Sequence, residues 1–125
     1  MRVRMVMKRT DLSSGEEEVF PAVSAILRDT DLLYREADTG ASVCVSFKDD
    51  TVVIERKAEI TSRTVLHKNR QGTSVVSSPY GTMELHTYMA DFAKMFDKWA
   101  VTYKITYSEE TAVEQKIEWM IMRQS

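Results

Sequence analysis

The sequence of 125 residues is poor in the residues that most often bind metals or act as nucleophiles. It has one cysteine, Cys44, and two histidines, His67 and His86, which are far apart in the chain. A single cysteine excludes an intrachain disulfide, and neither histidine has a second histidine or cysteine at zinc-site spacing. We therefore expect no metal site, no cofactor and a reducing, cytoplasmic compartment. Cys44 lies in the mainly apolar stretch 43–47, where we expect a buried, inert thiol.

Long hydrophobic runs and a strong charge of either sign are also absent. The longest apolar run is far shorter than the ~20 residues of a membrane-spanning helix. The net charge is −2, from 17 basic and 19 acidic residues. We therefore expect neither a nucleic-acid nor a membrane partner. The N-terminal basic cluster is interpreted as a solvated strand face rather than a nucleic-acid arm, and no apolar block follows it, so we expect no secretory leader. This cluster consists of Arg2, Arg4, Lys8 and Arg9.

Glycine is scarce as well, and the glycine-rich motifs of nucleotide-binding proteins are missing. The four glycines form neither GxGxxG nor GxxxxGK[ST], and there is no GxSxG nucleophile motif. The sequence thus contains no catalytic motif, and we do not expect an enzyme.

What the sequence does have is a period of two. Hydrophobic residues make up 43% of the chain, and they alternate with polar ones in residues 1–8, 41–48, 99–107 and 113–121. Such alternation is typical of strands with one buried and one solvated face. Short turn-forming segments separate the runs, so about eight to ten strands are expected. The prediction is a single all-β domain over residues 1–125, an antiparallel, up-and-down barrel.

One segment fits two structures. Met89, Phe92, Phe96 and Trp99 have the spacing i, i+3, i+7, i+10, which predicts a short helix over residues 91–98. A strand that starts near Met83 and continues, or bulges, through this segment fits equally well.

Four aromatic residues are candidates to line a ligand cavity. Trp99, Tyr103, Tyr107 and Trp119 all fall on strand faces that the alternation predicts to be buried. Inward aromatics either fill a core or line a cavity with their polar ends available to a ligand. Both interpretations stay open at this stage.

Three polar residues are candidates for contact with a ligand or substrate. Glu84 and His86 share one face of the strand that follows the turn Ser78–Gly81, and Arg63 is placed on the preceding strand. The turn has the residue preferences of type I, with proline second and glycine fourth. The simpler interpretation is that Glu84, His86 and Tyr88 form the solvated face of that strand.

Several segments resemble the YwiB-like family of uncharacterised proteins, found mainly in low-GC Gram-positive bacteria. The similarity rests on "SSPYGTMELHTYM", on Tyr34 and Glu36 in "DTDLLYREAD", on Ile54 and Arg56 in "VVIERK", and on "WAVTYKITY" and "KIEWMIM". These segments occur in the same order over most of the chain. The resemblance implies a calycin-like, lipocalin-like β-barrel and no known activity, although the Gly-x-Trp motif of true lipocalins is missing.

These observations favour a non-enzymatic protein that binds a small apolar or aromatic ligand in the barrel interior. The first alternative is a structural or protein-interaction module with a filled core, including a homodimer. It is suggested by Met120 and Met122, which alternate out of phase with Trp119 and Ile121 and make both faces of the last strand apolar. The second alternative is an enzyme that uses Glu84 and His86.

Overall fold

All regular structure in the part of the chain that the structure describes is β-strand. The computed structural model describes residues 1–108 and 111–123, and these contain eleven strands and no helix. The strands are β1 (Arg2–Asp11), β2 (Glu17–Val19), β3 (Val23–Leu27), β4 (Asp31–Arg35), β5 (Ser42–Lys48), β6 (Thr51–Lys57), β7 (Thr61–His67), β8 (Arg70–Ser78), β9 (Gly81–Lys94), β10 (Lys98–Thr106) and β11 (Ala112–Met122).

The strands form one antiparallel sheet that closes into a ring. From β3 to β11 each strand pairs with its neighbours in the chain. One edge of β1 pairs with β11, and its other edge pairs with both β3 and β2. Because β2 and β3 share that edge, the eleven strands occupy ten positions around the ring. The prediction of an antiparallel, up-and-down barrel is confirmed.

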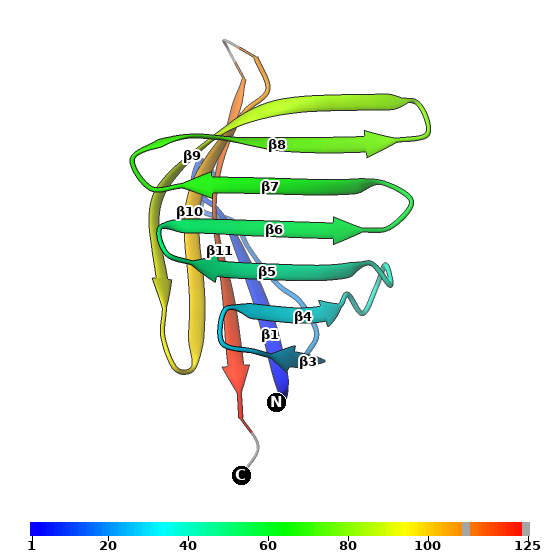
Figure 1. Ribbon diagram of the computed structural model, residues 1–125, viewed down its shortest axis with the longest axis vertical. Coiled ribbons are helices and arrows are strands. Elements are labelled where there is room, and N and C mark those ends of the chain that lie inside the picture. The colour runs from blue at the N-terminus through cyan, green and yellow to red at the C-terminus, as the bar shows by residue number, and fades with distance from the viewer. Residues whose placement is uncertain (109–110, 124–125) are drawn as a thin grey trace.

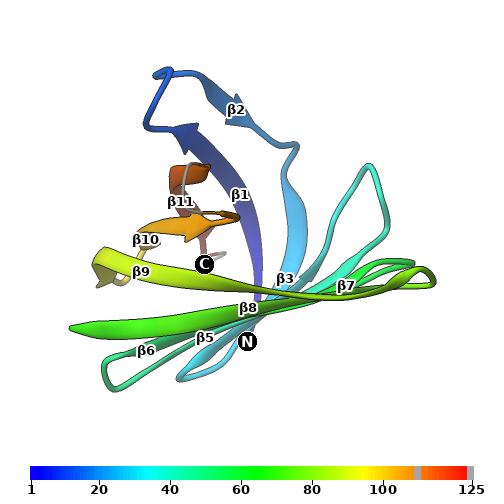
Figure 2. The same cartoon turned by 90° about the horizontal axis from the view of Figure 1, so that it is seen from above.

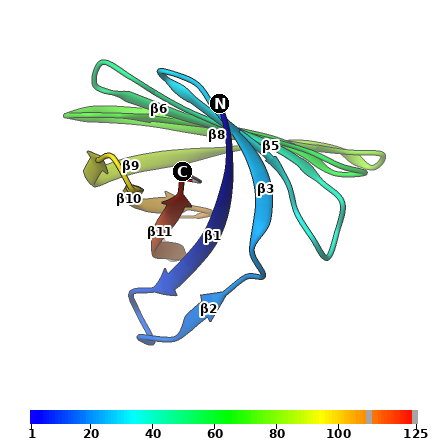
Figure 3. The same cartoon turned by 90° about the horizontal axis from the view of Figure 1, so that it is seen from below.

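The barrel is flattened into two layers whose strands cross. Figure 1 shows β5, β6, β7 and β8 running across β1, β10 and β11, and Figure 2 shows the two layers edge-on. The long strand β9 starts in the first layer and bends into the second. Figure 3 shows β1 curving past β3 to close the ring. The interior is the space between these layers.

The segment 91–98 is strand and turn, so the helical alternative is wrong. β9 continues to Lys94 and pairs with β10 along its length. Thr102 pairs with Asp91 and Tyr103 with Met89, so Ala90 is an extra residue in β9, a β-bulge. The bulge shifts the alternation by one position, and both Met89 and Phe92 therefore pack against the core. An i, i+3 spacing that suggests a helix arises here from a bulged strand.

Aromatic side chains fill the barrel centre. Trp99 and Trp119 are directly opposite each other on β10 and β11, and they are 2% and 0% exposed. The ring of Phe47, from the other layer, lies 5.1 Å from that of Trp99 and 6.1 Å from that of Trp119. Tilted and edge-on pairs at such distances add roughly 0.5–1.5 kcal/mol each beyond their burial. This cluster joins the two layers.

The turn between β8 and β9 is a two-residue hairpin loop. β8 ends at Ser78 and β9 begins at Gly81, with Pro79 and Tyr80 between them. Neither loop residue has a positive φ, which is what the predicted type I turn requires. Tyr80 is 99% exposed, so the loop is a solvated corner.

Candidate functional site

The four predicted cavity aromatics do not share one environment. Trp99, Trp119 and Tyr103 are buried, and Gln115 donates a hydrogen bond of 2.5 Å to the Tyr103 hydroxyl. Tyr107 is 48% exposed because β10 ends at Thr106 and the chain bends away from the barrel there. The expectation that Tyr107 is buried is therefore wrong. The two tryptophans pack into the filled centre, and Trp119 is connected to the pocket described below through a hydrogen bond.

The three polar candidates lie on the outer surface. The Arg63 side chain is 60% exposed, and its Nε is 3.9 Å from a Glu55 carboxylate oxygen, so Arg63 is a surface charge. Glu84 and His86 are exposed, and His86 Nδ1 lies 2.5 Å from Nε2 of Gln71. The predicted solvated face of β9 is thus correct at these two positions. The structure does not bring Arg63 and His86 together in a cleft.

Leu85 and Thr87, on the opposite face of β9 from Glu84 and His86, are buried, whereas Met83, on the same face as Leu85, is not. Met83 is 49% exposed because it lies near the hairpin end of β9, which extends beyond the closed part of the barrel. Alternation predicts the correct face for this residue, but no second layer covers that face at its position.

A pocket of about 460 Å³ lies at one open end of the barrel. We call it the mouth pocket. Its floor consists of the inward side chains of Met5 and Met7 from β1, Val23 from β3 and Tyr34 from β4. Its rim is formed by the connection between β2 and β3, by the loop between β4 and β5, and by the end of β6. In Figure 2 the loop between β4 and β5 lies beside β3 on the open side of the barrel.

The Tyr34 hydroxyl is the polar group on the floor of the mouth pocket. It accepts a hydrogen bond of 3.1 Å from the indole Nε1 of Trp119 and donates one to the sulfur of Met7 at 3.7 Å. Burial raises the pKa of Tyr34 to about 12. The hydrogen bond from Trp119 lowers this pKa, but by less than burial raises it. The hydroxyl is therefore neutral at physiological pH, when it can hydrogen-bond a ligand without carrying charge.

A bidentate ion pair forms one side of the rim. Arg56 Nε and Nη2 donate hydrogen bonds of 3.0 and 2.9 Å to the two carboxylate oxygens of Glu36. Thr39 Oγ1 donates a further bond of 2.5 Å to the same carboxylate. The Arg56 hydrogen bond is the main reason why the pKa of Glu36 lies below its ordinary value. The pair fixes the loop between β4 and β5 against β6.

A second ion pair forms the facing side of the rim. Arg9 Nη2 lies 2.6 Å from a carboxylate oxygen of Glu18. The Arg9 guanidinium also lies 5.6 Å from the centre of the Phe20 ring, within cation–π range. These contacts hold the segment from β2 to β3 over the pocket. The rim thus combines an aromatic ring, two ion pairs and the exposed carboxylate of Asp38, which has no cation within ion-pairing distance among the described residues.

The remaining candidate chemistries find little support in the described residues. No group of three or more His, Cys, Asp or Glu side chains in residues 1–108 and 111–123 could hold a metal ion. Cys44 is half-buried on the outer face, not in the core as expected, and burial raises the pKa of its thiol. Within the same residues there is no helix with the length and apolar character of a membrane span.

Comparison with known proteins places the chain in a family. The model of a family described as "Domain of unknown function (DUF1934)" matches residues 24–119. The chain belongs to this family. The crystal structure of the YwiB protein from Bacillus subtilis is similar to it, with a TM-score of 0.69 and 12% identity over 99% of this chain and 92% of that one. The YwiB-like resemblance is thereby confirmed, and at this identity the structural match shows the shared fold alone. No curated protein matches the chain.

Sequence reasoning noted Tyr34, Glu36 and Arg56 only as features of the YwiB-like resemblance, yet all three line the mouth pocket. The sequence did contain a signal for the position of this pocket. In β6 the inward positions read Val52, Ile54, Arg56, so a charged residue ends an otherwise apolar alternation. A charge on the inward face, at the end of a strand, indicates the place where a barrel opens to solvent.

Proposed function

We propose that this protein is a non-enzymatic binder of a small apolar or aromatic molecule, which it holds in the mouth pocket at the open end of the barrel. The observation that carries the proposal is the composition of this pocket. Met5, Met7 and Val23 make its floor apolar, and the neutral Tyr34 hydroxyl, which already bonds Trp119 and Met7, keeps one lone pair to accept a hydrogen bond from a ligand. An apolar floor with polar groups placed around it is typical of small-molecule sites.

The two ion pairs on the rim favour an uncharged ligand. Arg56 is paired with Glu36, and Arg9 with Glu18, so neither guanidinium needs a charge from the ligand. The same pairs hold both walls of the pocket in place before a ligand arrives, which reduces the entropy lost on binding. The two methionines add adaptable surface that can fit ligands of different shape.

The proposal includes a calycin-like, lipocalin-like mode of ligand binding by the barrel, and a location in the cytoplasm. It is supported by the closed, up-and-down antiparallel ring with a pocket at one end. It differs from the sequence expectation in the position of the ligand, because Trp99 and Trp119 fill the barrel centre. The reducing compartment is supported by the single cysteine.

The test is binding of neutral probes to the full chain, with indole and decanol as the aromatic and aliphatic examples. At a concentration of ~100 Kd, a probe specific for the folded state should stabilise the protein by about 2.7 kcal/mol. NMR should show saturable shifts of the methyl groups of Met5 and Met7. Ala37→Trp places a large ring at the rim and should weaken probe binding by about tenfold or more.

Ala58→Trp is the matched control, since Ala58 is also exposed but lies in the turn after β6 and is not among the residues that line the pocket. It should leave probe affinity unchanged. Absence of saturable shifts at Met5 and Met7 with every probe, or equal binding by the two tryptophan variants, would refute the proposal.

A second candidate is a protein-interaction module, including a homodimer. It is favoured by the filled aromatic centre around Trp119 and by Met122, which is 44% exposed on the outer face of β11. An enzyme that uses Glu84 and His86 has no comparable geometric support, because both side chains are exposed on the outer face of β9.

A further inference from the structure

A groove of about 750 Å³ crosses the outer face of β1, β3, β4, β5 and β6. We call it the outer groove. Its floor is apolar, and cations lie along its edges; these residues are Ile26, Leu33 and Cys44 on the floor and Arg2, Arg35 and Lys57 at the edges. In Figure 1 the outer face of β5 and β6 is turned to the viewer, with no described element in front of it. The groove is on the other side of the sheet from the mouth pocket.

Exposed cations alternate with serines in one row across five strands. In order of strand position the row is Arg4, Ser24, Arg35, Ser42 and Lys57. Neighbouring strands are about 4.8 Å apart, so the Arg35 and Lys57 backbones are roughly 10 Å apart with Ser42 midway. A carboxylate above Ser42 would lie between two cations and next to a hydroxyl donor.

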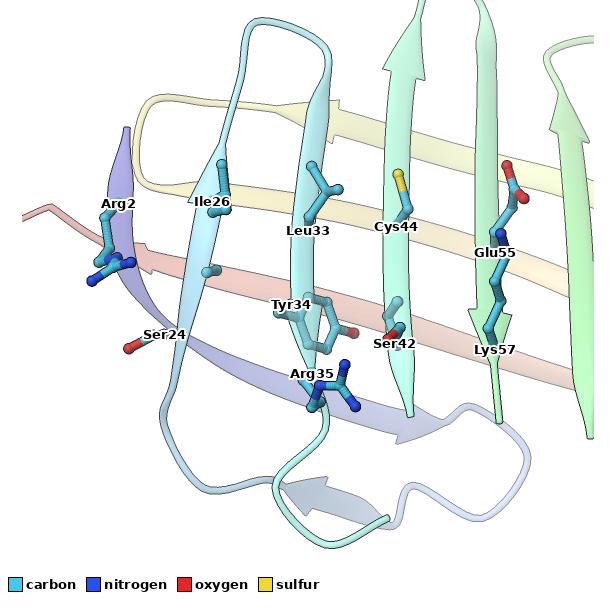
Figure 4. Close-up of a pocket in the computed structure, with 12 residues that line it drawn as sticks. Arg2, Ser24, Ile26, Leu33, Tyr34, Arg35, Ser42, Cys44, Glu55 and Lys57 are labelled. Atoms are coloured by element: carbon cyan, nitrogen blue, oxygen red, sulfur yellow. The ribbon is translucent and has the colours of Figure 1, made fainter. Parts of the chain in front are cut away.

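The next row along the same strands is apolar on β3, β4 and β5, and it is flanked by Arg2 on β1 and Glu55 on β6. Ile26, Leu33 and Cys44 are opposite one another on β3, β4 and β5, and Figure 4 shows their side chains side by side. Ile26 is 44% exposed, although it is a large apolar residue. The two rows are two residues apart along each strand, a distance of about 6.6 Å.

The outer groove is positively charged, although the whole chain has a net charge of −2. Its lining contains three cations against one carboxylate, that of Glu55, which pairs with Arg63 at 3.9 Å. Among the described residues, no carboxylate lies within ion-pairing distance of Arg2, Arg35 or Lys57. A partner with complementary charge would therefore be acidic. A second copy placed face to face would bring like charges together.

We propose that the outer groove binds an extended acidic segment of a partner polypeptide. Its acidic side chain lies over Ser42 between Arg35 and Lys57, and an apolar side chain two residues away packs on Leu33 and Cys44. Residues i and i+2 of an extended chain point the same way and are about 6.6 Å apart, which matches the distance between the rows.

The groove does not suit single-stranded nucleic acid, because its outward lining has no aromatic side chain on which a base could stack. Tyr34 is the aromatic residue of the lining, and Figure 4 shows its ring behind the sheet, on the inward side.

The test is an NMR titration of the full chain with synthetic peptides. A Glu-Ser-Leu-Ser-Glu-Ser-Leu-Ser peptide places Glu and Leu on one face, whereas Glu-Leu-Ser-Ser-Glu-Leu-Ser-Ser has the same composition and places them on opposite faces. We expect the first peptide to shift amides of β4, β5 and β6 saturably, and to bind at least about tenfold more tightly than the second. Affinity should fall as salt rises.

The double variant Arg35→Glu with Lys57→Glu should weaken the first peptide at least about tenfold. Lys68→Glu with Lys104→Glu changes the net charge equally at exposed sites outside the groove, and should leave affinity within about twofold. Equal binding of the two peptides, equal loss in both double variants, or no saturable shift would overturn the proposal. Tighter binding of a thymidine oligonucleotide at the same amides, or a dimer in light scattering that only the groove variant disrupts, would also overturn it.

Discussion

At the scale of single residues, the most informative contact is the ion pair between Glu36 and Arg56. The two residues come from different strands, and their side chains are 23% and 34% exposed, so water screens the pair only in part. The pair connects a loop that is otherwise exposed at Ala37, Asp38 and Thr39 to the end of β6. It is therefore the contact on which the shape of the mouth pocket depends most directly.

Glu36→Gln should lower the free energy of unfolding near neutral pH by about 1 kcal/mol, because it replaces charged hydrogen bonds with neutral ones. The pKa of Glu36 is lowered in the folded state, mainly by the Arg56 hydrogen bond. Its stabilising effect is therefore fully present above the ordinary pKa of a glutamate and is lost as the pH falls through the lower folded value. Urea unfolding at a series of pH values should show wild type and variant converging in acid.

Glu17→Gln is the control for this measurement. Glu17 pairs with Lys8 at 3.3 Å, but its side chain is 54% exposed, so the substitution should change stability by less than about 0.5 kcal/mol. A stability difference between wild type and Glu36→Gln that persists unchanged in acid would contradict the assigned role of the carboxylate.

At the scale of elements, Gly72 explains a local distortion in β8. Val65 pairs with Thr73 and His67 pairs with Arg70, so Gln71 and Gly72 together face Leu66. The backbone is crowded at this bulge. A Cβ on Gly72 would lie 2.0 Å from the Val65 carbonyl oxygen and 2.6 Å from Thr87 Oγ1, which donates a hydrogen bond of 2.7 Å to that oxygen.

Gly72→Ala should therefore destabilise the protein by about 2 kcal/mol or more, since backbone atoms cannot move as easily as a flexible side chain. Gly15→Ala adds the same methyl group where nothing lies within 4 Å, although at φ +79°. It should cost about 1 kcal/mol from backbone strain alone. Thermal unfolding of both variants compares the two costs. Equal melting temperatures would show that the crowding at Gly72 is relieved at little cost in free energy.

The elements themselves could be predicted from the sequence because alternation and turn residues are local properties. Trp99, Val101 and Tyr103 follow the predicted period, and the loop at Pro79 and Tyr80 follows known turn preferences. The bulged strand around Ala90 was one of two alternatives, because an extra residue changes the period in a way that also resembles a helix. A bulge becomes visible only when the register of the partner strand is known.

At the scale of the whole molecule, the candidate site could not be predicted because it depends on which strand ends meet. Glu36 and Arg56 are separated by a complete hairpin, and Arg9 and Phe20 come from the start of the chain. No local pattern says that these positions lie around one opening. The pocket is set by closure of the ring between β1 and β11, a pairing of the first and last strands.

Closure also determines how the barrel unfolds. Because β1 pairs with β11, and because Trp119, which is opposite Trp99 on β10, packs against Phe47 of the other layer, neither layer has a core of its own. Trp119→Phe leaves a void and removes the hydrogen bond to Tyr34, and should cost roughly 2 kcal/mol. Native-state hydrogen exchange should then show the same loss of protection in β1, β5 and β10, as expected for one cooperative unit. Tyr107→Phe, at an exposed position, should change none of these rates. A loss confined to β10 and β11 would mean instead that the two layers open separately and that the tryptophan pair stabilises only its own side of the barrel.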